Sequence, residues 1–123
     1  MDVKVFGVVG AGQMGSGIAH VAAVAGLQVI MNDIKQEFVD RGFKTIEGNL
    51  GRAVSKGKMS EQEKSEILAR IKGSTDLKDF KDADFVVEAV LEDLELKKTV
   101  FSTLDEVVPK GKILWIGLRS KKR

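Results

Sequence analysis

The stretch VVGAGQMGSG, residues 8–17, decides the fold of this chain. Four of its ten residues are glycine, and Gly10, Gly12 and Gly15 form the pattern GxGxxG. Before it, residues 3–9 alternate and are rich in Val and Phe, which predicts a strand. After it, residues 16–25 carry apolar side chains at helical spacing, which predicts a helix. The glycines therefore join a strand to a helix, and this context makes an otherwise weak motif specific.

The three glycines have different expected roles. Gly10 permits a tight turn, Gly12 has no Cβ where a diphosphate would lie, and Gly15 lets the helix approach the strand closely. The N–H groups of the first helical turn and the positive end of the helix dipole then favour a bound diphosphate. A flexible turn without a ligand and an S-adenosylmethionine site are the alternatives for a Gly-rich turn.

Asp33 follows a second predicted strand over residues 27–32. A carboxylate at that position can accept hydrogen bonds from both hydroxyls of an adenosine ribose. It would repel a 2′-phosphate, so the sequence favours NAD over NADP. Asp33 could instead cap a helix that begins at Ile34.

The remaining pattern alternates helices and strands. We expect helices over residues 35–54, from a Ser60/Glu63 capping box onward, and from Asp93 to Pro109, with strands at 72–75, 85–90 and 112–116. The expected inner faces are Ile18, Val21, Ala22 and Ala25 in the first helix and Ile67, Leu68 and Ile71 in the third. This order predicts a three-layer α/β fold of the Rossmann type, doubly wound, with a mostly parallel sheet, helices on both faces and an inserted helical hairpin.

Composition restricts the possible functions. The 123 residues make one domain at most, and a net charge of +2 from 20 basic and 18 acidic residues gives no reason to expect nucleic acid as a partner. Without Cys there are no disulfides or Cys-ligated metals, and we expect no metal site. The sequence has neither a signal peptide nor a membrane-spanning run, so we expect a cytoplasmic protein with no membrane partner.

Three stretches, GAGQMGSGIAHVAAVAG, IEGNLGRAVSKGKMSEQEK and FVVEAVLEDLELKKTVF, resemble the NAD-binding domain of 3-hydroxyacyl-CoA dehydrogenases, a family that includes the 3-hydroxybutyryl-CoA dehydrogenases. The resemblance implies hydride transfer between C3 of a 3-hydroxyacyl-CoA and nicotinamide. It implies cofactor contacts at Gly10, Gly12, Gln13, Met14, Gly15, Asp33, Ala89, Val90, Glu92 and Lys97, and CoA contacts near Asn49 and Lys56. Glu92 and Lys97 could instead form a surface ion pair, and Lys56 could be an ordinary exposed lysine.

The catalytic residues of that family cannot be assigned in this chain. The family uses a His held by a Glu, together with Ser and Asn, whereas the one histidine here, His20, is expected to face solvent from the first helix. The resemblance ends after residue 114, so we expect an incomplete NAD-binding domain over 1–114 and a divergent basic tail over 115–123. An exposed sheet edge would favour a homo-oligomer such as a dimer.

We therefore expect NAD binding without turnover. The alternatives are a β-hydroxyacid dehydrogenase of the 6-phosphogluconate type and a stand-alone dinucleotide-binding module.

Overall fold

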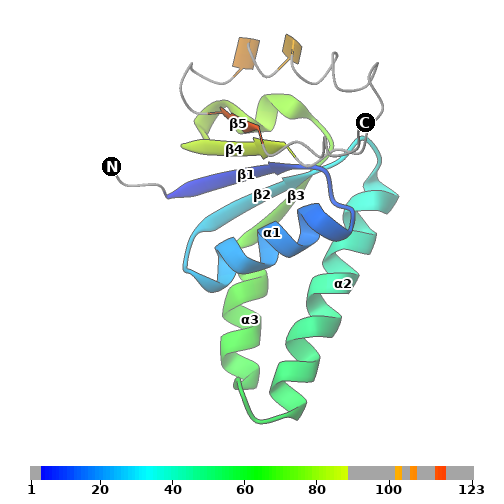
Figure 1. Cartoon of the computed structure of the whole chain (residues 1–123), viewed down its shortest axis with the longest axis vertical. Helices are drawn as coiled ribbons and strands as arrows, with labels where there is room; N and C mark the ends of the chain where they lie inside the picture. Colours follow the sequence, from blue (N-terminus) through cyan, green and yellow to red (C-terminus); the bar gives the residue numbers. More distant parts are fainter. Residues whose placement is uncertain (1–3, 89–101, 104–105, 108–112, 116–123) are drawn as a thin grey trace.

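The computed structural model describes residues 4–88, 102–103, 106–107 and 113–115. Its elements are β1 (Val5–Val9), α1 (Gln13–Val24), β2 (Gln28–Asn32), α2 (Gln36–Ser55), α3 (Glu61–Ala69), β3 (Ile71–Ser74), the 3-10 helix η1 (Leu77–Asp82), β4 (Phe85–Glu88) and β5 (Ile113–Trp115). The five strands form one sheet in the order β3-β2-β1-β4-β5 (Figure 1). All four strand pairings are parallel. The Rossmann-type prediction is therefore confirmed.

The turn between β1 and α1 depends on two glycines. Gly10 has a φ of 111°, a conformation that side chains disfavour, and its N–H donates to the carbonyl of Asn32 at 2.7 Å. A Cβ at Gly15 would lie 1.8 Å from the carbonyl oxygen of Gly10. Helix α1 can therefore sit against the end of β1 only because residue 15 is glycine.

This contact also sets which face of α1 is buried. The buried residues are Gly15, Ser16, Ala19, Ala22 and Ala23. The predicted face, which included Val21 and Ala25, is wrong by roughly a quarter turn, since Val21 is 68% exposed and Ala25 is exposed as well. The packing of Gly15 on Gly10 fixes the rotation of the helix about its axis. The spacing of its apolar side chains therefore does not decide which face is buried.

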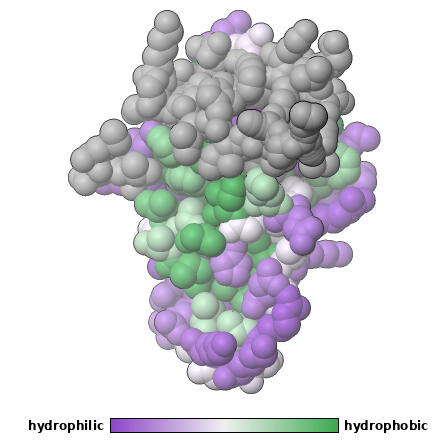
Figure 2. Space-filling view, in the orientation of Figure 1, coloured by the Kyte–Doolittle hydropathy of each residue, from purple (hydrophilic) through white to green (hydrophobic). Residues whose placement is uncertain are grey.

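The rotation of α1 has two visible consequences. His20 is partly buried rather than directed fully into solvent. Met14, Val21 and Val24 are 45%, 68% and 48% exposed, and apolar surface gathers over α1 on the face seen in Figure 2. The outward side of this helix thus carries apolar side chains, including Val21, which was expected to face the sheet.

The main core lies between the sheet and the helices α1, α2 and α3. It contains Val8, Ala11, Ala19, Ala22, Ala23, Val29, Met31, Val39, Ile46, Leu50, Ile67 and Ile71. A smaller cluster on the other face centres on Phe80, which is fully buried. Phe80 belongs to η1, so a segment for which the sequence predicted neither helix nor strand is a 3-10 helix with a core residue. Among the described residues, η1 therefore packs on the second face of the sheet.

Helices α2 and α3 form the expected hairpin, which extends away from the sheet (Figure 1). The capping box is confirmed: the Glu63 N–H donates to Ser60 Oγ at 3.0 Å, and the Ser60 N–H donates to Glu63 Oε1 at 2.9 Å. The chain leaves the helical conformation between α2 and α3, where Gly57 has a φ of 73°. Ile71, expected on the inner face of the helix, is instead the first residue of β3.

The strand predictions hold with small shifts of their ends. The start of the predicted 85–90 strand is β4, which lies between β1 and β5, while residues 89 and 90 fall outside the described residues. The predicted start of the next helix at Asp93 falls outside them too. In β5, Trp115 pairs with Glu88. The predicted domain boundary after Leu114 stays a prediction. Among the described residues, no helix is long and apolar enough to span a bilayer.

Gly15→Ala tests the contact that sets α1. The new methyl group would collide with backbone at Gly10, so we expect a loss of about 1–3 kcal/mol or more in the free energy of unfolding. The control is Gly17→Ala in the same helix, where a Cβ meets nothing within 4 Å. There we expect a gain of about 0.5–1 kcal/mol, because alanine favours helix. Urea unfolding followed by circular dichroism measures both, and equal stability of the two variants would contradict the expectation.

Candidate nucleotide-binding site

The N-terminus of α1 has free hydrogen-bonding capacity. Its N-cap is Gly12, so no side chain caps it, and the first turn contains no acidic residue. The first helical bond runs from the Ser16 N–H to the Gly12 carbonyl at 2.8 Å. Helix α3, by contrast, has a complete capping box. The unpaired amides at the start of α1 form a site suited to an anion.

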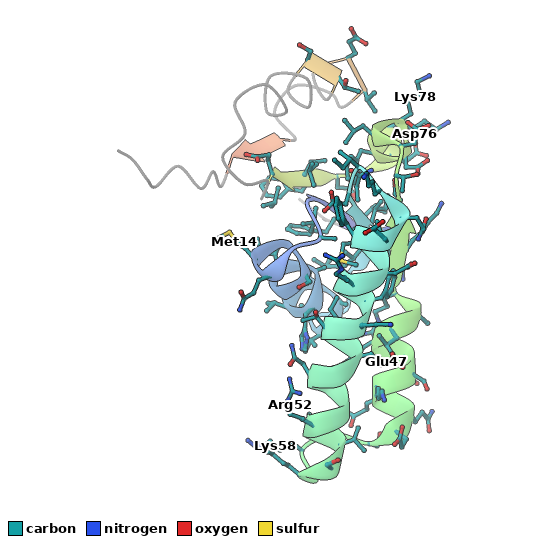
Figure 3. The ribbon with its side chains drawn as sticks, turned by 90° about the vertical axis from the view of Figure 1, so that its right-hand side faces the viewer. Met14, Glu47, Arg52, Lys58, Asp76 and Lys78 are labelled. Carbon is teal, nitrogen blue, oxygen red and sulfur yellow. The ribbon has the colours of Figure 1, made fainter. Side chains whose placement is uncertain are left out.

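The approach to these amides is open. A Cβ built on Gly12 would meet nothing within 4 Å. Gly12, Gln13 and Met14 are all exposed, and in Figure 3 the side chain of Met14 points away from the body of the molecule. A diphosphate can therefore reach the backbone here, as the sequence predicted for a glycine at this position.

Asp33 lies beside the glycine turn, at the end of β2. Its Oδ2 accepts a hydrogen bond from the Ala11 N–H at 2.8 Å, and its Oδ1 accepts one from the Ile34 N–H at 2.7 Å. The N-cap of α2 is Lys35, so Asp33 does not occupy the N-cap position of that helix. Each carboxylate oxygen retains a lone pair for a ligand. Asp33 can thus bind a sugar hydroxyl while it remains bonded to the turn.

These observations define a class of protein. The parallel sheet switches direction of winding at β1, between β2 and β4, and ligands of such sheets bind at the carboxyl ends of the strands near this point. There the glycine turn presents amide donors that a diphosphate could accept, and Asp33 presents a carboxylate that a sugar hydroxyl could reach. The bond from Ala11 to Asp33 holds the two parts together. The chain is an α/β domain of the dinucleotide-binding class.

Comparison with known proteins identifies the family. Residues 5–116 match the family described as 3-hydroxyacyl-CoA dehydrogenase, NAD binding domain, and the chain belongs to this family. A probable 3-hydroxybutyryl-CoA dehydrogenase of Deinococcus radiodurans is 50% identical over 107 residues, which are 86% of this chain and 38% of the relative. One from Bacillus subtilis is 42% identical over 114 residues, 93% of this chain and 40% of the relative.

A solved structure agrees with the assignment. The (S)-3-hydroxybutyryl-CoA dehydrogenase of Ralstonia eutropha has a TM-score of 0.88 and 41% identity, over 93% of this chain and 41% of that protein. The chain thus spans about two fifths of the length of these relatives. The cofactor of the family is NAD, which decides against S-adenosylmethionine. The match to this family also favours the 3-hydroxyacyl-CoA dehydrogenases over the 6-phosphogluconate type.

The predicted CoA contacts lie on the hairpin, apart from the glycine turn. Asn49 and Lys56 are both exposed, and Asn49 Oδ1 accepts a hydrogen bond from Arg52. Lys56 is the C-cap of α2 and lies about 30 Å from the start of this 20-residue helix. In Figure 3, Arg52 and Lys58 point to the same side of the molecule as Met14. This side of the hairpin is therefore basic.

Four predicted cofactor residues cannot be placed. Ala89, Val90, Glu92 and Lys97 lie outside the described residues. Their roles stay predictions.

Sequence reasoning missed two side chains next to the site. Asn32 and Ser74 are buried at the carboxyl ends of adjacent strands, and the Asn32 Nδ2 donates to Ser74 Oγ at 3.0 Å. The signal was available, since Asn32 and Ser74 are polar residues at the ends of the second and third predicted strands. Neither residue belongs to a known motif, so the sequence alone does not indicate that they are in contact.

Asp33→Ala tests the sugar contact. We expect it to weaken NADH binding by about 1–3 kcal/mol, the cost of losing a charged acceptor for ribose hydroxyls. It should also raise the affinity for NADPH relative to NADH, because the repulsion of a 2′-phosphate is removed. Isothermal titration calorimetry with both nucleotides measures this. The control is Asp82→Ala, an exposed carboxylate in η1, and an unchanged affinity of Asp33→Ala for NADH would exclude the contact.

Proposed function

We propose that this chain is the NAD-binding part of an NAD-dependent 3-hydroxyacyl-CoA dehydrogenase that acts on 3-hydroxybutyryl-CoA or a similar short acyl-CoA. The relatives with this activity in their names are 42% and 50% identical to it, but are much longer. We assign the protein to fatty-acid or butyrate metabolism in the cytoplasm, as a homo-oligomer.

One observation carries the nucleotide part of this proposal. The Ala11 N–H connects the uncapped amides of α1 to the carboxylate of Asp33. Hydrogen-bond donors for a phosphate and a hydrogen-bond acceptor for a sugar hydroxyl therefore form one unit. A diphosphate would accept hydrogen bonds from the first turn of α1, next to Gly12. Asp33 would accept hydrogen bonds from the adenosine ribose. When bound, NAD supplies the hydride acceptor for a secondary alcohol.

Oxidation of that alcohol also needs a base for the hydroxyl proton. His20 is on α1 in the phosphate-binding half of the site and is two turns from the glycine bend. It cannot reach the position of the nicotinamide at the far end of a dinucleotide whose phosphates lie at Gly12. The proposal therefore assigns no catalytic base to this chain.

The hairpin would contribute to the acyl-CoA site. Asn49 and Lys56 are exposed on α2, and Arg52 and Lys58 add positive charge to the same region. Such a surface favours the phosphate groups of CoA. We propose that Lys56 contacts one of these phosphates and that Asn49, held by Arg52, donates a hydrogen bond to the CoA chain.

Gly12→Ala separates nucleotide binding from folding. Because a Cβ at this position has open space and the backbone is extended, we expect a folded protein. The methyl group would occupy the space of the diphosphate, so NADH affinity should fall at least about tenfold, as expected for a lost set of charge-assisted hydrogen bonds. Gly17→Ala makes the same chemical change further along α1. Quenching or enhancement of NADH fluorescence measures both, and equal affinities of the two variants would refute a diphosphate at Gly12.

Turnover is tested with acetoacetyl-CoA and NADH. We expect this chain to bind NADH without oxidising it, because no catalytic base is assigned to it. The loss of absorbance of NADH is followed against a sample without protein. A rate above that background, abolished by Gly12→Ala, would show that the chain contains a base that this proposal omits.

A further inference from the structure

A partly buried polar network lies next to the candidate site, at the ends of β2 and β3. Asn32 Nδ2 donates to Ser74 Oγ at 3.0 Å, and Ser74 Oγ donates to Asp79 Oδ2 at 2.7 Å. Asn32 and Ser74 are 3% and 5% exposed. We call these three residues the Asn32–Ser74–Asp79 bridge. It joins three elements of the fold: β2, its neighbour in the sheet β3, and η1.

The hydroxyl of Ser74 uses all of its hydrogen-bonding capacity. Besides the Asn32 amide it accepts the Asp76 N–H at 3.2 Å, and the Asp76 carbonyl at 3.0 Å is a second acceptor for its proton. A hydroxyl has one donor and two lone pairs, and all are used here. Fully satisfied buried networks restrict geometry in a way that apolar packing does not, because hydrogen bonds are directional.

The main chain of the same residues holds the candidate site. The Asn32 carbonyl accepts the Gly10 N–H at 2.7 Å, and the Ser74 carbonyl accepts the Asp33 N–H at 3.0 Å. Asn32 and Ser74 therefore contact the glycine turn and Asp33 through their backbones, and each other through their side chains. A shift of β3 relative to β2 would move Asp33 away from the turn.

We propose that the Asn32–Ser74–Asp79 bridge positions the Asp33 carboxylate for the ribose of the nucleotide. This inference rests on the proposed nucleotide site. None of the three bridge side chains touches the ligand, so they are positioning residues. Their effect passes through the bond between the Ser74 carbonyl and the Asp33 N–H, and through Asn32, which precedes Asp33. A hydrogen bond weakens steeply when its geometry changes, so a small displacement of Asp33 costs affinity.

A double-mutant cycle on the dissociation constant of NADH tests the proposal. Ser74→Ala should weaken binding about threefold to tenfold, the range for loss of one well-placed hydrogen bond. In the Asp33→Ala background, Ser74→Ala should have no further effect, because the contact through which it acts is already absent. The matched control is Ser65→Ala, an exposed serine of α3, which should leave the dissociation constant unchanged.

A second ligand separates positioning from general damage. The affinity for ADP should fall in Ser74→Ala, whereas the affinity for 2′,3′-dideoxyadenosine diphosphate should not, since that ligand lacks the hydroxyls that Asp33 binds. If Ser74→Ala does not fold, Asp79→Ala takes its place in the cycle, because Asp79 is exposed and is the last member of the bridge.

The outcomes are distinct. The positioning role would be overturned if Ser74→Ala weakened NADH binding equally in the wild-type and Asp33→Ala backgrounds. It would also be overturned if Ser74→Ala weakened the binding of ADP and of 2′,3′-dideoxyadenosine diphosphate equally. An unchanged dissociation constant in Ser74→Ala would overturn it as well. An unchanged constant in Asp33→Ala would instead overturn the sugar contact of the proposed function, and the bridge proposal with it.

Discussion

The contact between Gly15 and the carbonyl oxygen of Gly10 is the constraint on which the rest of this domain depends. There is no room for a side chain, since a Cβ would lie 1.8 Å from that oxygen. Through this contact the first turn of α1 is pressed against the end of β1. It determines which residues of α1 face the sheet and where the amides of its first turn lie. The proposed nucleotide site is thus a direct product of backbone packing.

Hydrogen bonds from the neighbouring strand complete that arrangement. The Gly10 N–H is held by Asn32, and the Ala11 N–H is held by Asp33. Consecutive amides of the turn are therefore bonded to Asn32, the last residue of β2, and to Asp33, which follows it. The bond from Gly10 to Asn32 attaches the turn to the sheet, and the bond from Ala11 to Asp33 holds a carboxylate beside the turn. Gly12 follows directly and is left open, so the accessible part of the turn begins where its bonding to β2 ends.

Features with a strong local signal were predicted well from the sequence. The GxGxxG turn, the place of Asp33 after the second strand, the Ser60/Glu63 capping box and the order of strands and helices follow from short patterns with direct physical causes. The buried face of α1 was predicted wrongly, because apolar spacing indicated Val21 whereas tertiary packing at Gly15 decided the rotation. The Asn32–Ser74–Asp79 bridge could not be predicted, because Asn32 and Ser74 lie 42 positions apart in the sequence.

A crystal structure of this chain with NADH tests the central claim most directly. We predict diphosphate oxygens within about 2.7–3.2 Å of the amide nitrogens in the first turn of α1, over Gly12, with a ribose hydroxyl donating to Asp33. The bonds from Ala11 to Asp33 and from Asn32 to Ser74 should remain. A nucleotide bound elsewhere, or an Asp33 carboxylate turned away from the sugar, would contradict the claim that the glycine turn and the end of β2 form one binding unit.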